Sequence, residues 1–428
     1  MVESATDTTG GGDVGTSSSG LQAGYASSDI TPALPVELAG HFSWRPRLGR
    51  QVHDPLHCRV VALRQGERCL SLASLDVLCV SEQLHRAILD NLDRQPQQLM
   101  LLATHTHSSF GGLFPSPGAS VLGQAHPRRL QWLAGLVART VQAAEQDLRP
   151  ARARFGRAEV AGFTSSRRRR FGPRDDEFRV LTMQRNGARD LVVVNASGHP
   201  VVVSEKDPQL VSADWPGELC RRLEAREQLP LFFPAALGGT SPLFPEFPME
   251  LERHLQLLGD LALQGVERAR DQEQPLGDET LSSSLVRLPH PPPRCQALSP
   301  LGLQGRLADL ALWPLRSWLR RGYRRMLAHP GGVPLHLARL GELLLVGSAH
   351  EMGAGLVGEI LRQVRGKGRE AMVASLADGY AGYLHLEDEY HHRPEKGFRF
   401  MSYYENALAV FGRHMSAGIL EQLGNWQG

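Results

Sequence analysis

Short apolar runs, each about the length of one strand, alternate along this chain with segments of helical spacing. The clearest runs are Cys58–Leu63, Leu70–Leu75 and Gln98–Thr104, which are rich in leucine, valine and alanine. Apolar runs of this length are typical of strands buried on both faces. Helical spacing is found at residues 81–94 and 127–147. This order predicts an α/β fold of mixed, buried β-sheets flanked by helices.

The alternation continues through the second half of the chain. Strands are expected at Leu191–Asn195, Leu231–Phe233 and Glu342–Gly347, and helices near residues 216–228, 250–272 and 303–326 and from about Gly353.

Residues 1–20 differ from the rest because they are rich in glycine, serine and threonine and have almost nothing to bury. They are predicted to form a flexible tail, followed by one catalytic domain at residues 21–428. Two stretches interrupt the pattern without clearly dividing it. They are the arginine run Arg167–Arg170 and the proline-rich run His290–Arg294, which predicts a surface loop or a hinge.

Bulk composition excludes several classes of protein. With 428 residues and 42% apolar residues the chain can bury a large core, and its formal net charge of +2 gives no reason to expect a nucleic-acid partner. No membrane span or basic, apolar leader is apparent, so a cytoplasmic location is expected. The five scattered cysteines predict neither a disulfide framework nor a cysteine metal site. They are Cys58, Cys69, Cys79, Cys220 and Cys295.

The sharpest chemical signal is His105-Thr-His107, directly after the apolar run that ends at Thr104. Residues two apart on a strand project to the same face, so both imidazoles could serve one metal at a solvent-facing sheet edge. A pair of hydrogen-bonded structural histidines is the alternative. A metallo-β-lactamase-like site would need an aspartate where Ser109 stands, so that class is excluded. An amidohydrolase barrel would need eight strand–helix repeats, which this order does not show, so the barrel remains only a minor alternative.

Two more candidate ligands follow apolar strands. His199 comes after the valine run at 191–195, and Glu351 comes after the strand expected at 342–347. Each has an ordinary structural explanation, since His199 could be a loop residue before Pro200 and Glu351 an acid favoured at a helix N-terminus. Their shared position at strand ends favours a metal site.

The chain as a whole resembles the neutral, non-lysosomal ceramidase family from about Ala23 to Gly412. The resemblance rests on the order and spacing of several short stretches. They are Ala23–Pro32, Val52–Leu56, Ser74–Asp76, Thr104–Ser108, Gly198–Pro200, Ser212–Gly217, Gly238–Pro242 and Tyr380–Tyr383.

This resemblance implies a zinc ion held by four side chains and three further residues at the reaction centre. The implied ligands are His105, His199, Glu351 and Tyr383. The other implied residues are His107, which is not a ligand, Ser241, matching a serine assigned as a nucleophile, and Arg167, an arginine whose register within residues 167–170 is open. For Arg167–Arg170, a solvated surface loop is the alternative.

The chain also departs from the family. Gly239 replaces an aspartate before Ser241, Ala349-His350 replaces a Pro-Gly pair before Glu351, and the C-terminal immunoglobulin-like domain is expected to be missing. The resulting hypothesis is a zinc-dependent hydrolase that cleaves an N-acyl amide bond of ceramide or a related N-acylated amine, lipid or peptide by metal-activated water. An acyltransferase or amide synthase using the same site, and a non-catalytic homologue that binds acyl ligands, are the alternatives. The sequence indicates no oligomeric state.

Overall fold

The computed structural model describes residues 20–41, 45–115, 121–245, 248–277, 280–290, 329, 331–390, 397–409 and 414–426. The predicted tail lies outside these residues except for Gly20, as do the helix expected near residues 303–326, Cys295 and most of the proline-rich run. The four cysteines within them form no disulfide with one another. In this part of the chain, no helix combines the length and apolarity that a membrane crossing requires.

The larger sheet has nine strands among the described residues and runs in the order β13-β11-β10-β8-β1-β5-β6-β7, with β15 paired to β8. Its two outermost pairs, β13 with β11 and β6 with β7, are parallel, and the pairs between them are antiparallel. The strand bounds are β1 (Gln22–Asp29), β5 (His57–Gln65), β6 (Arg68–Leu75), β7 (Leu99–Ala103), β8 (Arg149–Glu159), β10 (Glu177–Arg185), β11 (Leu191–Ala196), β13 (Leu229–Pro234) and β15 (Gln274–Pro275).

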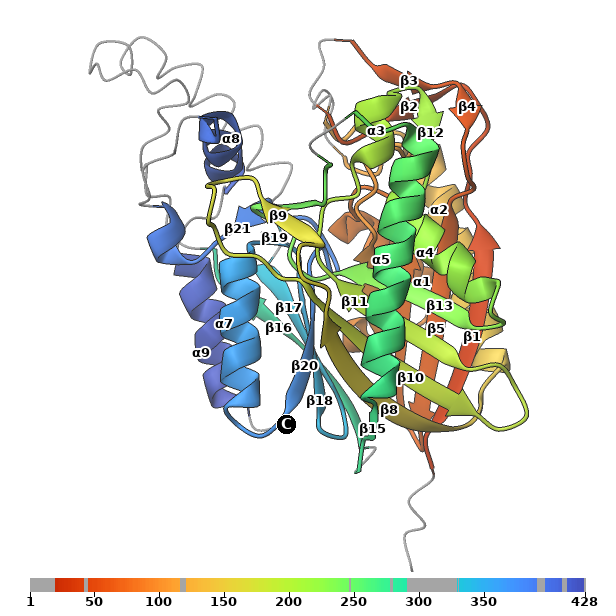
Figure 1. Ribbon diagram of the computed structural model, residues 1–428. Coiled ribbons are helices and arrows are strands. Elements are labelled where there is room, and N and C mark those ends of the chain that lie inside the picture. Colours follow the sequence, from red (N-terminus) through yellow and green to blue (C-terminus); the bar gives the residue numbers. More distant parts are fainter. Residues whose placement is uncertain are drawn as a thin grey trace, which may run out of the picture.

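A smaller sheet packs against the inner face of the larger one (Figure 1). Its order is β16-β17-β18-β20, with only the last pair parallel. The bounds are β16 (Leu281–Leu288), β17 (Val333–Leu340), β18 (Leu343–Ser348) and β20 (Glu370–Ala374).

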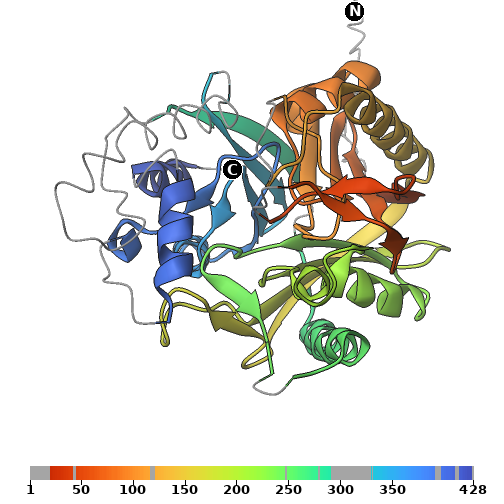
Figure 2. The same ribbon diagram turned by 90° about the horizontal axis from the view of Figure 1, so that it is seen from above.

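Helices cover the outer faces of both sheets, which gives four layers (Figures 1 and 2). The helices α1, α2, α4 and α5 lie on the larger sheet, and α7 and α9 lie side by side on the smaller one. The α-helix bounds are α1 (Glu82–Leu92), α2 (Pro127–Gln146), α3 (Val202–Lys206), α4 (Asp214–Glu224), α5 (Leu251–Asp271), α7 (Ala354–Arg365), α8 (Arg399–Leu408) and α9 (His414–Asn425). Two short 3-10 helices are η1 (Pro96–Gln98) and η2 (Glu387–Tyr390).

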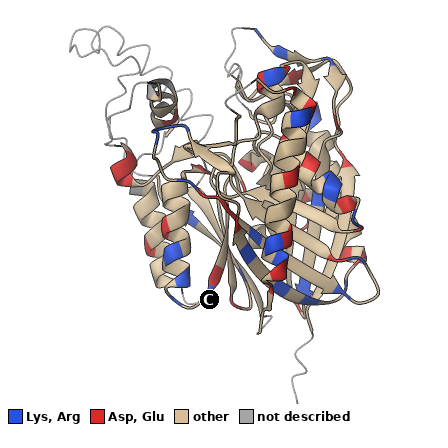
Figure 3. Ribbon diagram, in the orientation of Figure 1, with Lys and Arg blue, Asp and Glu red and all other residues tan. Residues whose placement is uncertain are grey.

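The layering explains why the strands read as continuous apolar runs. In β11, Val193 packs into the core between the two sheets, whereas Val192 and Val194 pack under α4 and α5. Both faces of the strand are therefore dry, and no polar alternation is possible. The predicted α/β fold of mixed, buried sheets is confirmed. On the outer surface, acidic and basic positions are interspersed along α5 (Figure 3).

Four two-stranded ladders lie together near one end of the sheets, at the top of Figure 1. They pair β12 (Leu210–Val211) with β4 (Gln51–Val52), β14 (Thr240–Pro242) with β9 (Thr164–Ser166), β19 (Glu351–Met352) with β21 (Tyr383–Leu384), and β2 (Val36–Leu38) with β3 (Arg47–Gly49). Most of the residues singled out from the sequence lie in or beside these ladders, so this end of the molecule holds the candidate site.

Candidate metal centre

The two histidines of the His-Thr-His motif lie beyond the end of β7, not on it. The strand ends at Ala103, and His105 adopts the left-handed backbone region with a φ of 71°. Non-glycine residues seldom occupy that region, and such residues concentrate at functional sites. The expectation that the strand pleat directs both side chains to one solvent-facing face was therefore wrong. A turn beyond the strand positions the two histidines, and His105 is only 2% exposed. Neighbouring loops hold the turn, since Thr106 Oγ1 donates to Ser212 O at 2.7 Å and His107 N donates to Pro200 O at 3.1 Å.

Backbone carbonyls fix the tautomers of His105 and His199. His105 Nδ1 lies 2.7 Å from Leu78 O, and His199 Nδ1 lies 3.1 Å from Thr240 O. A carbonyl oxygen can only accept a hydrogen bond, so each Nδ1 must carry the proton. Both Nε2 atoms consequently present lone pairs, as metal-binding histidines do when their other nitrogen donates to a carbonyl.

Glu351 and Tyr383 are brought together by strand pairing. They are register partners in the parallel ladder of β19 and β21, although 31 positions of sequence separate them. Tyr380 OH donates to Glu351 Oε1 at 2.7 Å and thereby orients the carboxylate. Nothing in the local sequence around Tyr380 indicates this hydrogen bond, because the contact depends on how this loop folds.

The Nε2 atoms of His105 and His199 and the Oε2 atom of Glu351 converge on one point. Glu351 Oε2 lies 3.2 Å from Nε2 of His105 and 3.2 Å from Nε2 of His199, yet this buried oxygen accepts no hydrogen bond among the described residues. Ligand atoms about 2.05 Å from a tetrahedral zinc are separated by about 3.3 Å. The observed separations fit that spacing, so the residues present can hold a metal ion. The ligand nitrogens of His105, His107 and His199 also lie within 4.8 Å of one another.

The charge states in the site also suit a cation. Burial, together with the nearby Arg167, lowers the pKa of His199 to about 3, and burial together with His105 lowers the pKa of His107 well below its usual value. Burial alone would raise the pKa of Glu351, but His105 and His199 outweigh it and the pKa is strongly lowered. The lowered pKa values of His199 and His107 favour their neutral imidazoles, and the lowered pKa of Glu351 favours its carboxylate, which are the forms that bind a cation.

Two residues of the arginine run, Arg167 and Arg168, point inward and form hydrogen bonds with other segments of the chain. Arg167 Nη2 donates to Tyr383 OH at 3.0 Å and lies 2.9 Å from His199 Nε2, whose one lone pair would go to a bound metal instead. Arg168 is buried and donates to Glu389 O at 3.2 Å. Only Arg170 is exposed, and Arg169 is half-buried. A fully solvated loop is thus excluded for the start of this run.

Ser241 lies in β14, next to the residue whose carbonyl accepts the His199 Nδ1 proton. Its backbone pairs with Ser165 of β9, and its side chain is half-buried. None of the described residues forms a side-chain hydrogen bond to Ser241 that would activate it as a nucleophile. A nucleophilic hydroxyl needs such a base within reach.

Gly40 makes room for His107. Gly40 has a φ of +109°, and a Cβ built on it would lie 2.8 Å from His107 Cβ, Cγ and Nδ1. We expect Gly40→Ala to displace His107 and to lower kcat at least tenfold, because misplacement of a group in a catalytic site by about 1 Å can cost a hundredfold. Steady-state kinetics of the purified variant measure this effect.

The matched control for that variant is Gly187→Ala. Gly187 also has a positive φ, of +66°, but a Cβ there would meet nothing within 4 Å. Alanine at Gly187 carries a backbone cost on the order of 1 kcal/mol, and the larger φ of Gly40 costs more, so kcat is compared per folded molecule. Similar losses of kcat in the two folded variants would contradict the contact-based explanation.

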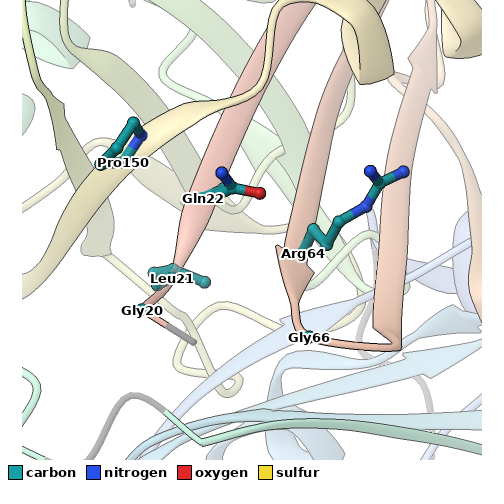
Figure 4. A pocket seen from close by; sticks show the side chains of 6 residues that line it. All are labelled: Gly20, Leu21, Gln22, Arg64, Gly66 and Pro150. Atoms are coloured by element: carbon teal, nitrogen blue, oxygen red, sulfur yellow. The ribbon is translucent and has the colours of Figure 1, made fainter. Parts of the chain in front are cut away.

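A shallow surface pocket lies away from these residues, at the start of β1 (Figure 4). Its lining includes no histidine and no carboxylate, so this pocket supplies none of the side chains that bind a metal ion. Its lining residues are Gly20, Leu21, Gln22, Arg64, Gly66 and Pro150.

Comparison with solved structures places the fold among the ceramidases. A ceramidase complexed with C2 superposes with a TM-score of 0.73 at 18% identity, covering 94% of this chain and 74% of that one. The neutral ceramidase from Pseudomonas aeruginosa superposes with a TM-score of 0.68 at 18% identity, covering 94% of this chain and 75% of that one. No protein-family model and no curated protein matches the sequence. The chain therefore has the fold of the ceramidase catalytic region, as its motifs predicted.

Proposed function

We propose that this protein is a zinc-dependent hydrolase of N-acyl amide bonds, with residues 21–428 as one catalytic domain and a cytoplasmic location. The observation that carries the proposal is the convergence of Glu351 Oε2 with the unprotonated Nε2 atoms of His105 and His199, within a ceramidase fold. Those three residues and Tyr383 would hold the ion. Bound zinc would supply a Lewis acid that polarises the amide carbonyl and activates water.

The other residues would bind and move protons. His107 Nε2 lies 3.4 Å from His105 Nε2 and is neutral, so it can accept a proton and pass it to the leaving amine. Arg167 Nη2 would donate to the oxygen on which negative charge develops. Ser241 would orient the substrate and not attack it, because none of the described side chains is hydrogen-bonded to it as a base.

The substrate we propose is ceramide or a related N-acylated amine, lipid or peptide. An acyltransferase or amide synthase would use the same residues in the reverse direction. The comparison of hydrolysis and condensation rates at equal enzyme concentration separates these activities.

The test begins with metal analysis of the purified protein and hydrolysis of a fluorescent N-acyl amine. We expect about one zinc per chain, and hydrolysis that disappears on chelation and returns with zinc. In ¹⁸O-labelled water, a single turnover by Ser241→Ala should still place the label in the released acid. A trapped acyl-serine in the wild type would contradict the role assigned to Ser241. A metal-free, inactive protein that still binds the acyl chain would instead identify a binding homologue.

A further inference from the structure

The helix α8 places one buried carboxylate against both inward-pointing arginines. Glu405 is 0% exposed. Its Oε1 accepts hydrogen bonds from Arg167 Nε at 2.7 Å and from Gly239 N at 3.0 Å. Its Oε2 accepts from Arg168 Nη1 at 3.1 Å and lies 3.1 Å from His385 Nε2. One side chain thus joins the arginine run, the loop before Ser241 and the segment after Tyr383.

Neighbouring residues of α8 support the same contact. Ser402 Oγ donates to Arg168 O at 3.1 Å, and Asn406 Oδ1 accepts from Arg168 Nη2 at 3.1 Å. Positions three and four apart on a helix share a face, so Ser402, Glu405 and Asn406 meet the arginine run together. This docking fixes where the carboxylate of Glu405 lies.

The electrostatics keep Glu405 ionised. Burial alone would raise the pKa of its carboxyl, but Arg167, His385 and Arg168 together outweigh burial and lower it. A buried anion is tolerated only where opposite charges and hydrogen bonds compensate it, and buried guanidinium groups need the same compensation. Without Glu405, the half-buried Arg167 and the buried Arg168 would lie beside each other without the carboxylate that now accepts hydrogen bonds from both.

The position of Glu405 determines where Arg167 points. The guanidinium group is planar and rigid, so a hydrogen bond that fixes Nε also fixes the direction of Nη2. With Nε held by Glu405, Nη2 faces Tyr383 OH and the His199 ring. Glu405 itself makes no hydrogen bond or ion pair with His105, His199, Glu351 or Tyr383 among the described residues, so its influence on the site passes through Arg167.

We propose that Glu405 is a positioning residue of this site, which aims the Arg167 guanidinium at the place where the oxyanion forms and so acts on the reaction only through Arg167. This rests on the proposed amide hydrolysis. In its absence Arg167 would turn to other acceptors and its preorganised donor would be lost.

The test is a double-mutant cycle in the zinc-loaded chain of 428 residues. We expect Glu405→Gln to lower kcat about 10- to 100-fold, the range for partners that orient site residues, with KM little changed and zinc content equal to wild type. In an Arg167→Ala background, Glu405→Gln should cost no further activity, because the group it positions is gone. Glu273→Gln is the matched control, since this buried carboxylate also lies among arginines. It directly precedes β15, which lies at the opposite end of the larger sheet (Figure 1).

Three outcomes would overturn the inference: an unchanged kcat, an equal loss of kcat in the Arg167→Ala background, or loss of zinc from Glu405→Gln. If Glu405→Gln fails to fold, Glu405→Asp, which keeps the charge but shortens its reach, takes its place in the cycle. Amide hydrogen exchange adds a readout independent of activity, because Arg167 N donates to Gly239 O and Gly239 N donates to Glu405. Faster exchange at these amides supports positioning even if the wild type hydrolyses no amide, which would refute only the proposed function.

Discussion

Glu351→Gln should lose its metal and nearly all of its activity. The substitution keeps the shape of the side chain but removes the negative charge beside His105 and His199. It also places an amide, which can donate hydrogen bonds, where two imidazole lone pairs converge. Zinc content should fall from about one per chain to near zero. The rate should fall on the order of a thousandfold or more, because a bound metal contributes several kcal/mol to stabilising the transition state.

Elemental analysis and kinetics of the same preparations measure both effects. Glu342→Gln is the control, since Glu342 is exposed in the turn before β18 and lies outside the ladder that holds Glu351. Tyr380→Phe provides an intermediate step: it removes only the hydrogen bond to Glu351 Oε1, so metal affinity should drop about 10- to 100-fold without being abolished. A Glu351→Gln protein that retained stoichiometric zinc would refute the assignment of Glu351 as a ligand.

His107→Ala is expected to keep its zinc and lose kcat. His107 is buried and neutral, and its Nε2 is close to but distinct from the point where Glu351, His105 and His199 meet. Removal of a general acid–base group typically costs a hundred- to ten-thousandfold, so a loss of about that size in kcat is expected with little change in KM.

This variant also distinguishes two possible ligand sets. The nitrogens of His105, His107 and His199 are close enough to bind one ion by themselves. If His107 were a ligand, His107→Ala would lose zinc together with activity, whereas Tyr383→Phe would retain zinc. The opposite pattern supports the set that contains Tyr383. The control is His254→Ala, since His254 is a buried histidine of α5 that hydrogen-bonds Leu243 O, away from the four proposed ligands.

The sequence predicted most of the helices and the apolar strands well. The expected helix at residues 127–147 corresponds to α2 (Pro127–Gln146), and the expected strand at 98–104 corresponds to β7 (Leu99–Ala103). Strands such as β8 and β10 were missed. In β8, exposed arginines alternate with small buried residues, and this pattern is weaker than the apolar runs that mark β11 and β13.

The sequence by itself determined the layered α/β architecture and the residue types at the site, because hydrophobic runs and short motifs are local properties. Tertiary structure alone decided how those residues meet. His105 reaches the site through a left-handed turn, and Tyr383 lies beside Glu351 because two distant strands pair. Four identical arginines in a row give no local reason to prefer one register. The buried carboxylate of Glu405, more than two hundred residues away, selects the two that point inward. Such choices depend on charge compensation between distant segments, which no local pattern in the sequence records.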